Sequence, residues 1–419
     1  MTTTTSVITV PAAVAAASEV AATLASPGAV LPDGYRGDGR RWPQSLAGGA
    51  AGIALLHVER ARSGHGDWAT ARGWLAEAAS GSITSASNAR LFFGAPALAF
   101  LFHAAAKSSG HYRTTLAALD DATLSITRTA LTAAHARIDR QELPKLAEFD
   151  LIRGLAGLGA YHLAAHPGHE ITRAVLACLA RLTEPLPGAQ DGLPAWWTSA
   201  SPSGEPSPDF PGGHGNFGMS HGISAVLAVL SLAIMRGITV PGAQEAARRI
   251  CAWTDQWRHG DQAAPWWPGV ITVRQAHAGR VDPALRPRPS WCYGAAGTAR
   301  AQQLAGLALG DPARCAAAEA AILAVLRDPS ELGPLTEPGL CHGTAGLLQA
   351  AWRMAADAAN GEIEAELPRL AARLAAQLAG RKDDNPELLD GTAGAALALH
   401  TAGTGSAPEP YWDAFLALA

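Results

Sequence analysis

A short run of small residues that begins with glycine recurs seven times along this chain of 419 residues. Each run, here called a glycine tetrad, precedes an apolar stretch with the spacing of a helix face, such as Ile53, Leu55, Leu56 and Val58. The first glycines of successive tetrads are 45 to 72 residues apart, a period that fits one pair of helices with its loops. The tetrads are Gly49–Gly52, Gly94–Ala97, Gly154–Gly157, Gly222–Ala225, Gly294–Gly297, Gly343–Gly346 and Gly391–Gly394.

The composition favours an all-α fold with a large core. Hydrophobic residues make up 48% of the chain. Residues 313–326 and 363–378 are rich in Ala and Leu, which favour helices, whereas β-branched and aromatic residues seldom alternate as they do in strands. Because small residues let backbones approach closely, the tetrads predict inner helices whose N-terminal ends gather at one end of a closed ring. An open solenoid of helix pairs is the alternative.

The repeats run from about residue 40 to the end and predict one domain, residues 41–419, after an N-terminal helix and connector in residues 1–40. The net charge of −4 and the lack of a long Lys or Arg run exclude nucleic acid as an expected partner. The apolar stretch Val10–Leu24 lacks the positive start of a signal peptide, and Glu19 interrupts it as a membrane span. We therefore expect a cytoplasmic protein without a membrane segment.

Two of the five cysteines occupy equivalent places, two residues before the first glycine of a tetrad. They are Cys292 in Trp-Cys-Tyr-Gly and Cys341 in Leu-Cys-His-Gly, and His342 follows the second. Two thiols and an imidazole are a ligand set for zinc, and three protein ligands leave one position for water or substrate, so the pattern predicts one catalytic Zn²⁺. A disulfide is the alternative, but it leaves His342 without a role in a reducing compartment. The other cysteines, Cys178, Cys251 and Cys315, are expected in the core.

Further polar residues stand just before the tetrads. His221, Tyr293 and Asp390 each precede a first glycine directly, and Asp150 lies four residues before one. Equivalent places in the repeat predict that these side chains project from loops at the same end of the fold. Asp390 is expected to cap its helix, because Leu389 stands where a second metal site would need a cysteine.

Two longer segments, residues 184–218 and 260–290, are rich in Pro, Gly and Trp and each precede a tetrad. Loops of this length are more often functional than idle. Their tryptophans are expected to be loop anchors or walls of a peptide groove. They are Trp196, Trp197, Trp266 and Trp267, with Trp291 at the edge of the second segment.

Four motifs together resemble the lanthionine synthetase C-like cyclases over residues from about 40 to 419. They are Phe-Asp-Leu-Ile-Arg-Gly-Leu-Ala-Gly (149–157), Ser-His-Gly-Ile (220–223), Trp-Cys-Tyr-Gly (291–294) and Cys-His-Gly-Thr-Ala-Gly (341–346). The resemblance implies an α/α toroid of seven inner and seven outer helices, which the repeat count also suggests. It implies one Zn²⁺ bound by Cys292, Cys341 and His342, and closure of thioether rings by addition of a peptide cysteine to dehydroalanine or dehydrobutyrine.

The resemblance also implies catalytic residues. His221 is the expected proton donor, since an imidazole titrates near neutral pH, and His214 is the second candidate. Asp150 is expected to orient His221 and favour its protonated form, or to cap the following helix. Arg288 is implied to stabilise an enolate, with a solvated loop arginine as the alternative. Tyr293 is expected to donate or accept a hydrogen bond in the site, or only to pack there.

The sequence thus predicts a stand-alone zinc-dependent lanthipeptide cyclase that acts on a dehydrated precursor peptide. A separate dehydratase would supply the dehydrated residues. Addition of glutathione to dehydrated peptide residues, as relatives of the family perform, is a second enzymatic hypothesis. A non-catalytic zinc-containing scaffold that binds peptides is a third, and it would not need His221. Prenyltransferases are also α/α rings with zinc, but their metal ligands include a carboxylate and they lack the Cys-His-Gly phrase.

Overall fold

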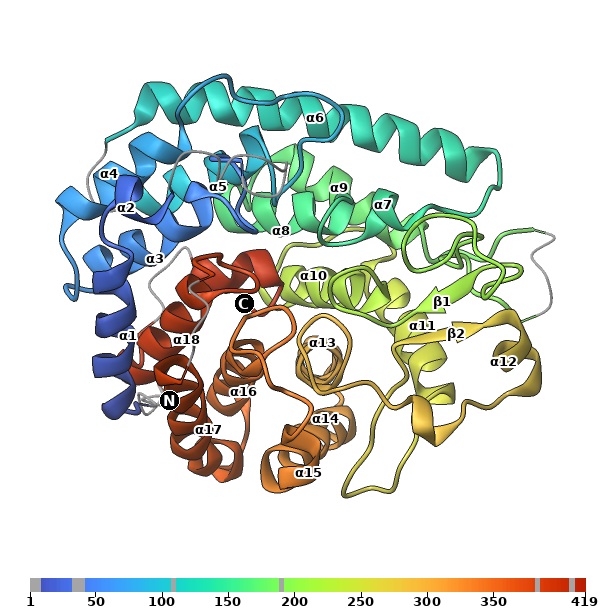
Figure 1. Cartoon of the computed structure of the whole chain (residues 1–419). Coiled ribbons are helices and arrows are strands. Elements are labelled where there is room, and N and C mark those ends of the chain that lie inside the picture. The colour runs from blue at the N-terminus through green and yellow to red at the C-terminus, as the bar shows by residue number, and fades with distance from the viewer. Residues whose placement is uncertain (1–8, 32–41, 107–110, 188–191, 381–384, 407–410) are drawn as a thin grey trace. The chain divides into compact units, whose positions relative to one another are not determined.

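In the computed structural model nearly all regular structure is helical (Figure 1). The structure describes residues 9–31, 42–106, 111–187, 192–380, 385–406 and 411–419. These ranges contain 18 α-helices and two strands of three residues each. The all-α class predicted from the composition is therefore confirmed. Residues 1–8 and 32–40 of the expected N-terminal segment lie outside the described ranges.

The chain divides into two compact units. The first comprises residues 1–123 and 326–412, and the second comprises residues 124–325 and 413–419. Helix α6 (Arg113–Asp139) crosses the boundary between them in sequence. Cys341, His342 and Asp390 belong to the first unit, whereas the other predicted site residues belong to the second.

Every glycine tetrad begins a helix, as the repeat predicts. The first glycine stands directly before the first helical residue in all seven cases, and these inner helices are buried along most of their length. They are α3 (Ala50–Arg62), α5 (Ala95–Ala106), α8 (Leu155–Ala165), α10 (Ile223–Met235), α13 (Ala295–Leu309), α16 (Thr344–Asp357) and α18 (Thr392–Thr404).

The first glycine of a tetrad is required by the loop that leads into the helix. A Cβ atom at Gly49 would lie 1.9 Å from the carbonyl oxygen of Trp42, and one at Gly294 would lie 2.0 Å from that of Arg288. Both contacts are with the preceding turn of the same chain, which folds back against the helix start. Glycine recurs there because a side chain would collide with this backbone.

The last glycine of the tetrad lies close to a neighbouring loop. Close approach of this kind was predicted from the sequence for the whole tetrad. A Cβ atom at Gly297 would lie 2.7 Å from the Cβ of Met219, which precedes α10. One at Gly394 would lie 2.7 Å from Cδ1 of Leu340, which precedes α16. The Cβ positions of Gly297 and Gly394 also lie 2.1 Å from Trp291 O and 1.9 Å from Leu388 O in their own preceding loops. The last glycine is therefore required both locally and by close approach between inner helix starts.

In the first unit, α16, α18, α3 and α5 follow one another as neighbours, although α18 and α3 come from opposite ends of the sequence. Outer helices cover them: α4 (Trp68–Ala78) packs on α3, and α17 (Glu362–Ala379) packs on α16 and α18. α1 (Ala12–Thr23) packs on α18 through small residues, and a Cβ atom at Gly403 would lie 2.8 Å from the amide nitrogen of Val14. The short helices α2 (Pro27–Val30) and α15 (Pro329–Leu332) complete this unit.

In the second unit, α10 lies between α8 and α13, with α9 (Glu170–Arg181) and α11 (Ala243–Gln256) outside them. α7 (Leu146–Phe149) leads into α8, and α14 (Pro312–Arg327) follows α13. The C-terminal residues are tied to α13 and its loop. Trp291 Nε1 donates a 3.0 Å hydrogen bond to the carbonyl oxygen of Leu416, and the Arg300 guanidinium donates to that of Leu418.

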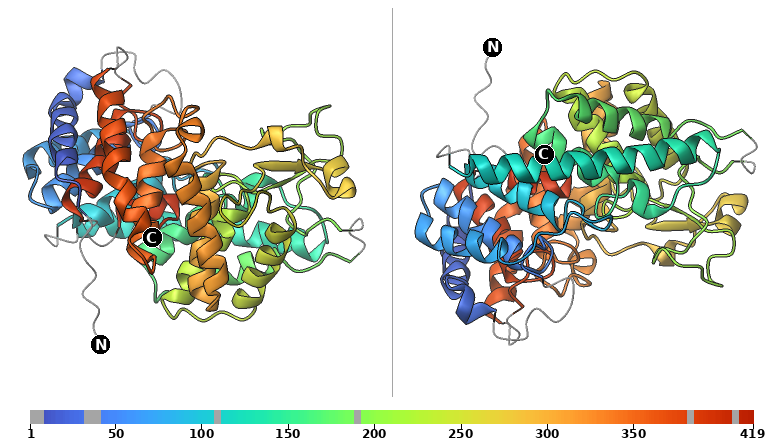
Figure 2. Two further views of the ribbon diagram at one scale, coloured as in Figure 1. Left: turned by 90° about the horizontal axis from the view of Figure 1, so that it is seen from below. Right: turned by 90° about the horizontal axis from the view of Figure 1, so that it is seen from above.

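The two long segments of the second unit meet in a small sheet. Strand β1 (His214–Asn216) pairs antiparallel with β2 (Val270–Thr272), and α12 (Val273–Ala278) follows at once. Figure 2 shows that the strands and α12 extend beyond the inner helices of this unit. The tryptophans of these segments are buried, which supports the interpretation as loop anchors. They are Trp196, Trp197, Trp266, Trp267 and Trp291.

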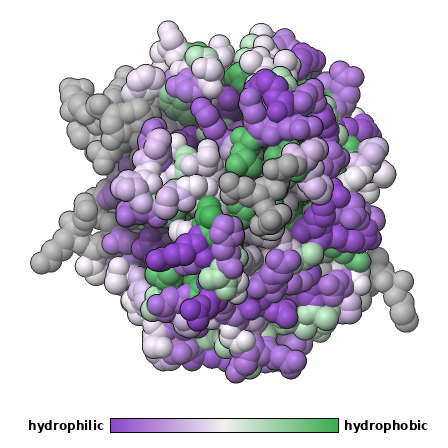
Figure 3. Space-filling model, turned by 90° about the vertical axis from the view of Figure 1, so that its right-hand side faces the viewer, coloured by the Kyte–Doolittle hydropathy of each residue, from purple (hydrophilic) through white to green (hydrophobic). Residues whose placement is uncertain are grey.

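The side of the molecule that carries β1, β2 and α12 is mainly hydrophilic, with hydrophobic residues confined to small areas (Figure 3). Among the described residues, no helix combines the length and the apolar character needed to cross a bilayer.

Candidate active site

Asp150 and His221 form a hydrogen-bonded pair in the second unit. The Asp150 side chain is fully buried, and its Oδ2 accepts a 2.6 Å hydrogen bond from Nδ1 of His221. The other oxygen, Oδ1, accepts a 2.6 Å hydrogen bond from the backbone N–H of Arg153. A 3.1 Å hydrogen bond from Leu151 N to Ser220 O joins the two loops that carry the pair. Asp150 therefore holds its own turn and the histidine ring at the same time.

This pairing assigns separate roles to the two nitrogens of His221. Nδ1 carries a proton that it donates to the carboxylate, so Nε2 is the nitrogen at which a proton can be gained or released. No residue in the described ranges forms a hydrogen bond with Nε2, and 27% of the side chain is exposed. His221 is thus oriented by a buried anion and still accessible from outside.

Asp150 does not occupy the N-cap position of α8, which is Gly154. The alternative of a simple helix cap is therefore wrong, although the bond to Arg153 N still stabilises the turn before the helix.

His214, the second candidate for proton donor, is placed differently. It is fully buried, its Nδ1 donates a 2.8 Å hydrogen bond to the carbonyl oxygen of Ala200, and its Nε2 lies 3.3 Å from Nδ2 of Asn216. Burial lowers the pKa of His214. Both of its nitrogens are engaged and its charged form is disfavoured, so the geometry favours His221 as the group that transfers protons.

The loop before α13 carries Cys292 and Tyr293. The Cys292 carbonyl oxygen accepts a 2.9 Å hydrogen bond from Met219 N, which joins this loop to the one before α10. Ser290 Oγ lies 3.4 Å from the sulfur of Cys292, a distance at which a hydroxyl can donate to a thiolate. Cys292 is 3% exposed.

Tyr293 lies beside the Asp150–His221 pair. The rings of Tyr293 and His221 are 6.5 Å apart between centroids. The Tyr293 hydroxyl accepts a 3.1 Å hydrogen bond from Nδ2 of Asn216, a buried residue at the end of β1. Asn216 was not among the site residues predicted from the sequence. The sequence feature that could have identified Asn216 is its place as a polar residue between two glycines, five positions before His221. It stands at the end of a long Pro- and Gly-rich segment.

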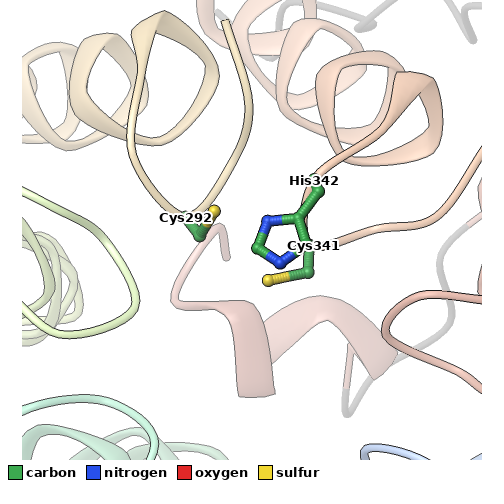
Figure 4. A group of neighbouring side chains, drawn as sticks. All are labelled: Cys292, Cys341 and His342. Atoms are coloured by element: carbon green, nitrogen blue, oxygen red, sulfur yellow. The ribbon is translucent and has the colours of Figure 1, made fainter. Parts of the chain in front are cut away.

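The loop before α16 carries the other two predicted zinc ligands. Cys341 is partly exposed, and its N–H donates a 2.8 Å hydrogen bond to Leu389 O, which fixes the loop against the start of α18. The His342 side chain is 43% exposed, and its Nε2 lies 4.0 Å from Oδ1 of Asp390. Figure 4 draws the three predicted ligands on their loops, Cys292 before α13 and Cys341 with His342 before α16.

The prediction that Asp390 caps its helix is wrong. The N-cap of α18 is Gly391, without a side-chain cap, and the Asp390 carboxylate lies instead beside His342. The N-cap position itself cannot carry a side chain, because a Cβ atom at Gly391 would lie 2.4 Å from the carbonyl oxygen of Asn385 in the preceding turn.

Arg288 is exposed, and its side chain forms no hydrogen bond or ion pair with residues in the described ranges. This exposure agrees with the alternative of a solvated loop arginine, and an enolate-binding role stays a prediction. Its neighbour Arg286 lies over the ring of Trp266, with Cζ 5.9 Å from the ring centroid.

The remaining cysteines are less suited to metal binding. Cys178 and Cys251 are buried, and burial raises their pKa to about 12 and about 11, respectively. Both stay protonated thiols at neutral pH, as expected of core residues. Cys315 is only partly buried, so the prediction that it lies in the core is only partly correct.

Residues 41–416 match the family of lanthionine synthetase C-like proteins. The chain belongs to this family. Its structure is also similar to that of nisin cyclase, with a TM-score of 0.75 at 19% sequence identity, over 90% of this chain and 92% of the other. No curated protein matches the chain in sequence.

Family membership and the structural similarity confirm the resemblance and the predicted lanthionine synthetase C-like toroid. Within this family member, the second unit joins Asp150 to His221, places Tyr293 beside His221 and holds Cys292 next to Tyr293 in the same loop. The first unit places Cys341 and His342 in the equivalent loop before α16.

Proposed function

We propose that this lanthionine synthetase C-like protein is a zinc-dependent lanthipeptide cyclase. It adds cysteine thiols of a dehydrated precursor peptide to dehydroalanine or dehydrobutyrine and so forms lanthionine or methyllanthionine rings. A separate dehydratase would supply the dehydrated peptide. Family membership supports the cyclase chemistry, and the hydrogen bond between Asp150 and His221 is the observation that carries the proposal, because it provides an oriented proton donor.

Cys292, Cys341 and His342 are the proposed zinc ligands. Two thiols with one imidazole suit zinc in donor type, and the three side chains stand at equivalent places in the loops before α13 and α16. Ser290 beside the sulfur of Cys292 and Asp390 beside His342 are the kind of outer partners that orient such ligands. When bound, zinc would favour the thiolate form of the substrate cysteine at neutral pH.

The residues of this chain can complete the addition. As the substrate sulfur bonds to the β-carbon, the electrons of the carbon–carbon double bond move toward the neighbouring carbonyl oxygen and form an enolate. The Nε2 proton of His221 then passes to the α-carbon, and the proton lost by the substrate thiol restores the histidine through solvent. No atom is gained or lost, so the ring product has the mass of its linear precursor.

Asp150 and Tyr293 assist this proton transfer in different ways. The buried carboxylate of Asp150 fixes the ring of His221 through Nδ1 and so leaves Nε2 for proton transfer. The Tyr293 hydroxyl is suited to donate a hydrogen bond to the enolate oxygen, where negative charge develops. Arg288 is a second candidate for that oxygen, through its exposed guanidinium.

The proposal is tested with purified protein, zinc and a dehydrated peptide that contains its own cysteine. We expect loss of the free thiol without a change in peptide mass, and about one zinc ion per chain by elemental analysis. A parallel sample offers free glutathione to a dehydrated peptide that lacks cysteine. Addition of glutathione at the higher rate would favour the second enzymatic hypothesis, and binding of peptide without reaction would favour the scaffold.

A further inference from the structure

The amide of Asn216 is fixed in one orientation by the backbone around it. Its Oδ1 accepts a 2.9 Å hydrogen bond from the N–H of Gly218, so the oxygen must face that amide. The Nδ2 group therefore faces the other way, 3.3 Å from Nε2 of His214 and 3.1 Å from the hydroxyl of Tyr293. Asn216 is 2% exposed, so these contacts are shielded from solvent.

Both partners of Nδ2 must act as acceptors, because an amide nitrogen of this kind only donates. His214 meets this requirement, since its Nδ1–H already donates to Ala200 O and leaves the lone pair of Nε2 for Asn216. Tyr293 meets it through a lone pair of its hydroxyl oxygen. The hydroxyl proton of Tyr293 is thus directed away from Asn216 and toward another acceptor.

Two glycines allow the amide and the tyrosine ring to lie close to the neighbouring backbone. A Cβ atom at Gly218 would lie 2.7 Å from Cε1 of Tyr293, and one at Gly222 would lie 2.5 Å from Oδ1 of Asn216. Asn216 is also the last residue of β1, where it pairs with Val270 of β2. Gly218 and Gly222 therefore leave room for the tyrosine ring and the amide, and the strand pairing fixes the backbone of Asn216.

We propose that Asn216 is a positioning residue that directs the hydroxyl proton of Tyr293 toward the carbonyl oxygen of the dehydro residue under attack. Asn216 does not touch the substrate; it acts through Tyr293, whose ring lies beside the proton donor His221. This inference rests on the proposed cyclase function and adds to it the hydrogen-bonded series Ala200–His214–Asn216–Tyr293.

Two substitutions test the direction of the hydrogen bond. Asn216→Ala removes the donor, and we expect the maximal rate of cyclisation to fall about 10- to 100-fold with little change in KM. Asn216→Asp keeps an oxygen for Gly218 N–H and nearly the same shape, but its second oxygen accepts the Tyr293 proton, so an equal or larger loss is expected. A wild-type rate in Asn216→Asp would overturn the inference. Asn360→Ala is the matched control, at an exposed position where the amide oxygen accepts from Glu362 N at the start of α17.

A double-mutant cycle separates positioning from general support of the fold. In a Tyr293→Phe background the substitution Asn216→Ala has no hydroxyl to direct, so we expect little further loss of rate. If Asn216→Ala lowers the rate by the same factor in both backgrounds, Asn216 acts independently of Tyr293 and the inference is wrong.

A spectroscopic measurement does not require activity. The chain has five tyrosines, so ¹³Cζ-tyrosine labelling gives a small set of signals, and the Tyr293 signal is identified by its loss in Tyr293→Phe. At fixed pH we expect Asn216→Ala to shift the Tyr293 signal and leave the other four in place. An unchanged Tyr293 signal contradicts the hydrogen bond. A wild-type protein that cyclises no peptide would count against the proposed function, while this experiment would still decide on Asn216.

Discussion

Nδ1 of His221 donates a 2.6 Å hydrogen bond to Oδ2 of the fully buried Asp150, although the two residues are 71 positions apart in the sequence. The carboxylate faces no solvent and is held on its other side by Arg153 N. The histidine therefore has one nitrogen committed to orientation and one left for proton transfer. Replacing His221 and Asp150 in turn tests these two roles.

Replacing His221 by alanine should remove the proton donor. We expect the maximal rate of cyclisation to fall about 10²- to 10⁴-fold, the usual contribution of general acid catalysis, while the zinc content stays at the wild-type level. Mass-resolved thiol loss measures the rate and elemental analysis the metal. A variant that cyclises at the wild-type rate would show that another group supplies the proton.

Asp150→Asn should keep the turn but lose the charge. The amide oxygen can still accept from Arg153 N, so we expect a normal circular dichroism spectrum. The maximal rate should be about 10- to 100-fold lower, because the amide nitrogen then faces Nδ1 of His221 and cannot accept its proton. Asp67→Asn, at the exposed cap of α4, is the control. Equal rates in the two variants would refute the role given to Asp150.

Cys341→Ala should lose zinc as well as activity, because two remaining ligands bind the ion much more weakly than three. Cys315→Ala removes a partly buried thiol that is not among the proposed ligands, and we expect it to keep the metal. Zinc per chain after dialysis, measured for both variants and wild type, checks the assignment. Full occupancy in Cys341→Ala would rule out Cys341 as a ligand.

Stability should fall in mild acid because of His400. Burial lowers the pKa of His400 to about 3, far below the usual histidine value of about 6.5. Between these values the unfolded chain binds a proton that the folded protein does not, so the unfolding free energy decreases as pH falls, by about 1.4 kcal/mol per pH unit for this group.

Urea denaturation at pH 7 and pH 5 measures this loss. We expect His400→Gln to reduce the difference between the two pH values, whereas His277→Gln, at an exposed position of α12, should leave it unchanged. The buried His57, whose pKa is also lowered by burial, contributes in the same direction and remains in both variants. An unaltered difference in His400→Gln would mean that His400 does not titrate in this way.

The glycines of the helix starts should not tolerate alanine. A Cβ atom at Gly394 would lie 1.9 Å from Leu388 O and 2.7 Å from Cδ1 of Leu340, so Gly394→Ala should lower the unfolding free energy by about 1–3 kcal/mol. Gly73 lies in the exposed part of α4 with nothing near its Cβ position, and Gly73→Ala should stabilise the protein by up to about 1 kcal/mol. Thermal unfolding of both variants gives the sign of each change.

Much of the fold could be predicted because its strongest signal is local. At Gly49 and Gly294 a side chain is excluded by backbone that lies only six or seven residues earlier in the same loop. One short motif therefore predicts each helix start. The side-chain types of the proposed zinc ligands Cys292, Cys341 and His342 could be recognised for the same reason. The pairing of β1 with β2 was not, because each strand has three residues and its partner lies in another long loop.

The sequence by itself determined the seven helix starts, the all-α class and which side chains precede the helices, since these depend on neighbours along the chain. Only the tertiary structure decided that Asp150 binds His221, that both nitrogens of His214 are engaged, that Asp390 lies beside His342 and that Asn216 donates to Tyr293. Except for those of His214, which lie within one long segment, these contacts join segments from different loops. Their hydrogen-bond directions follow from packing and burial, which no pattern along one segment encodes.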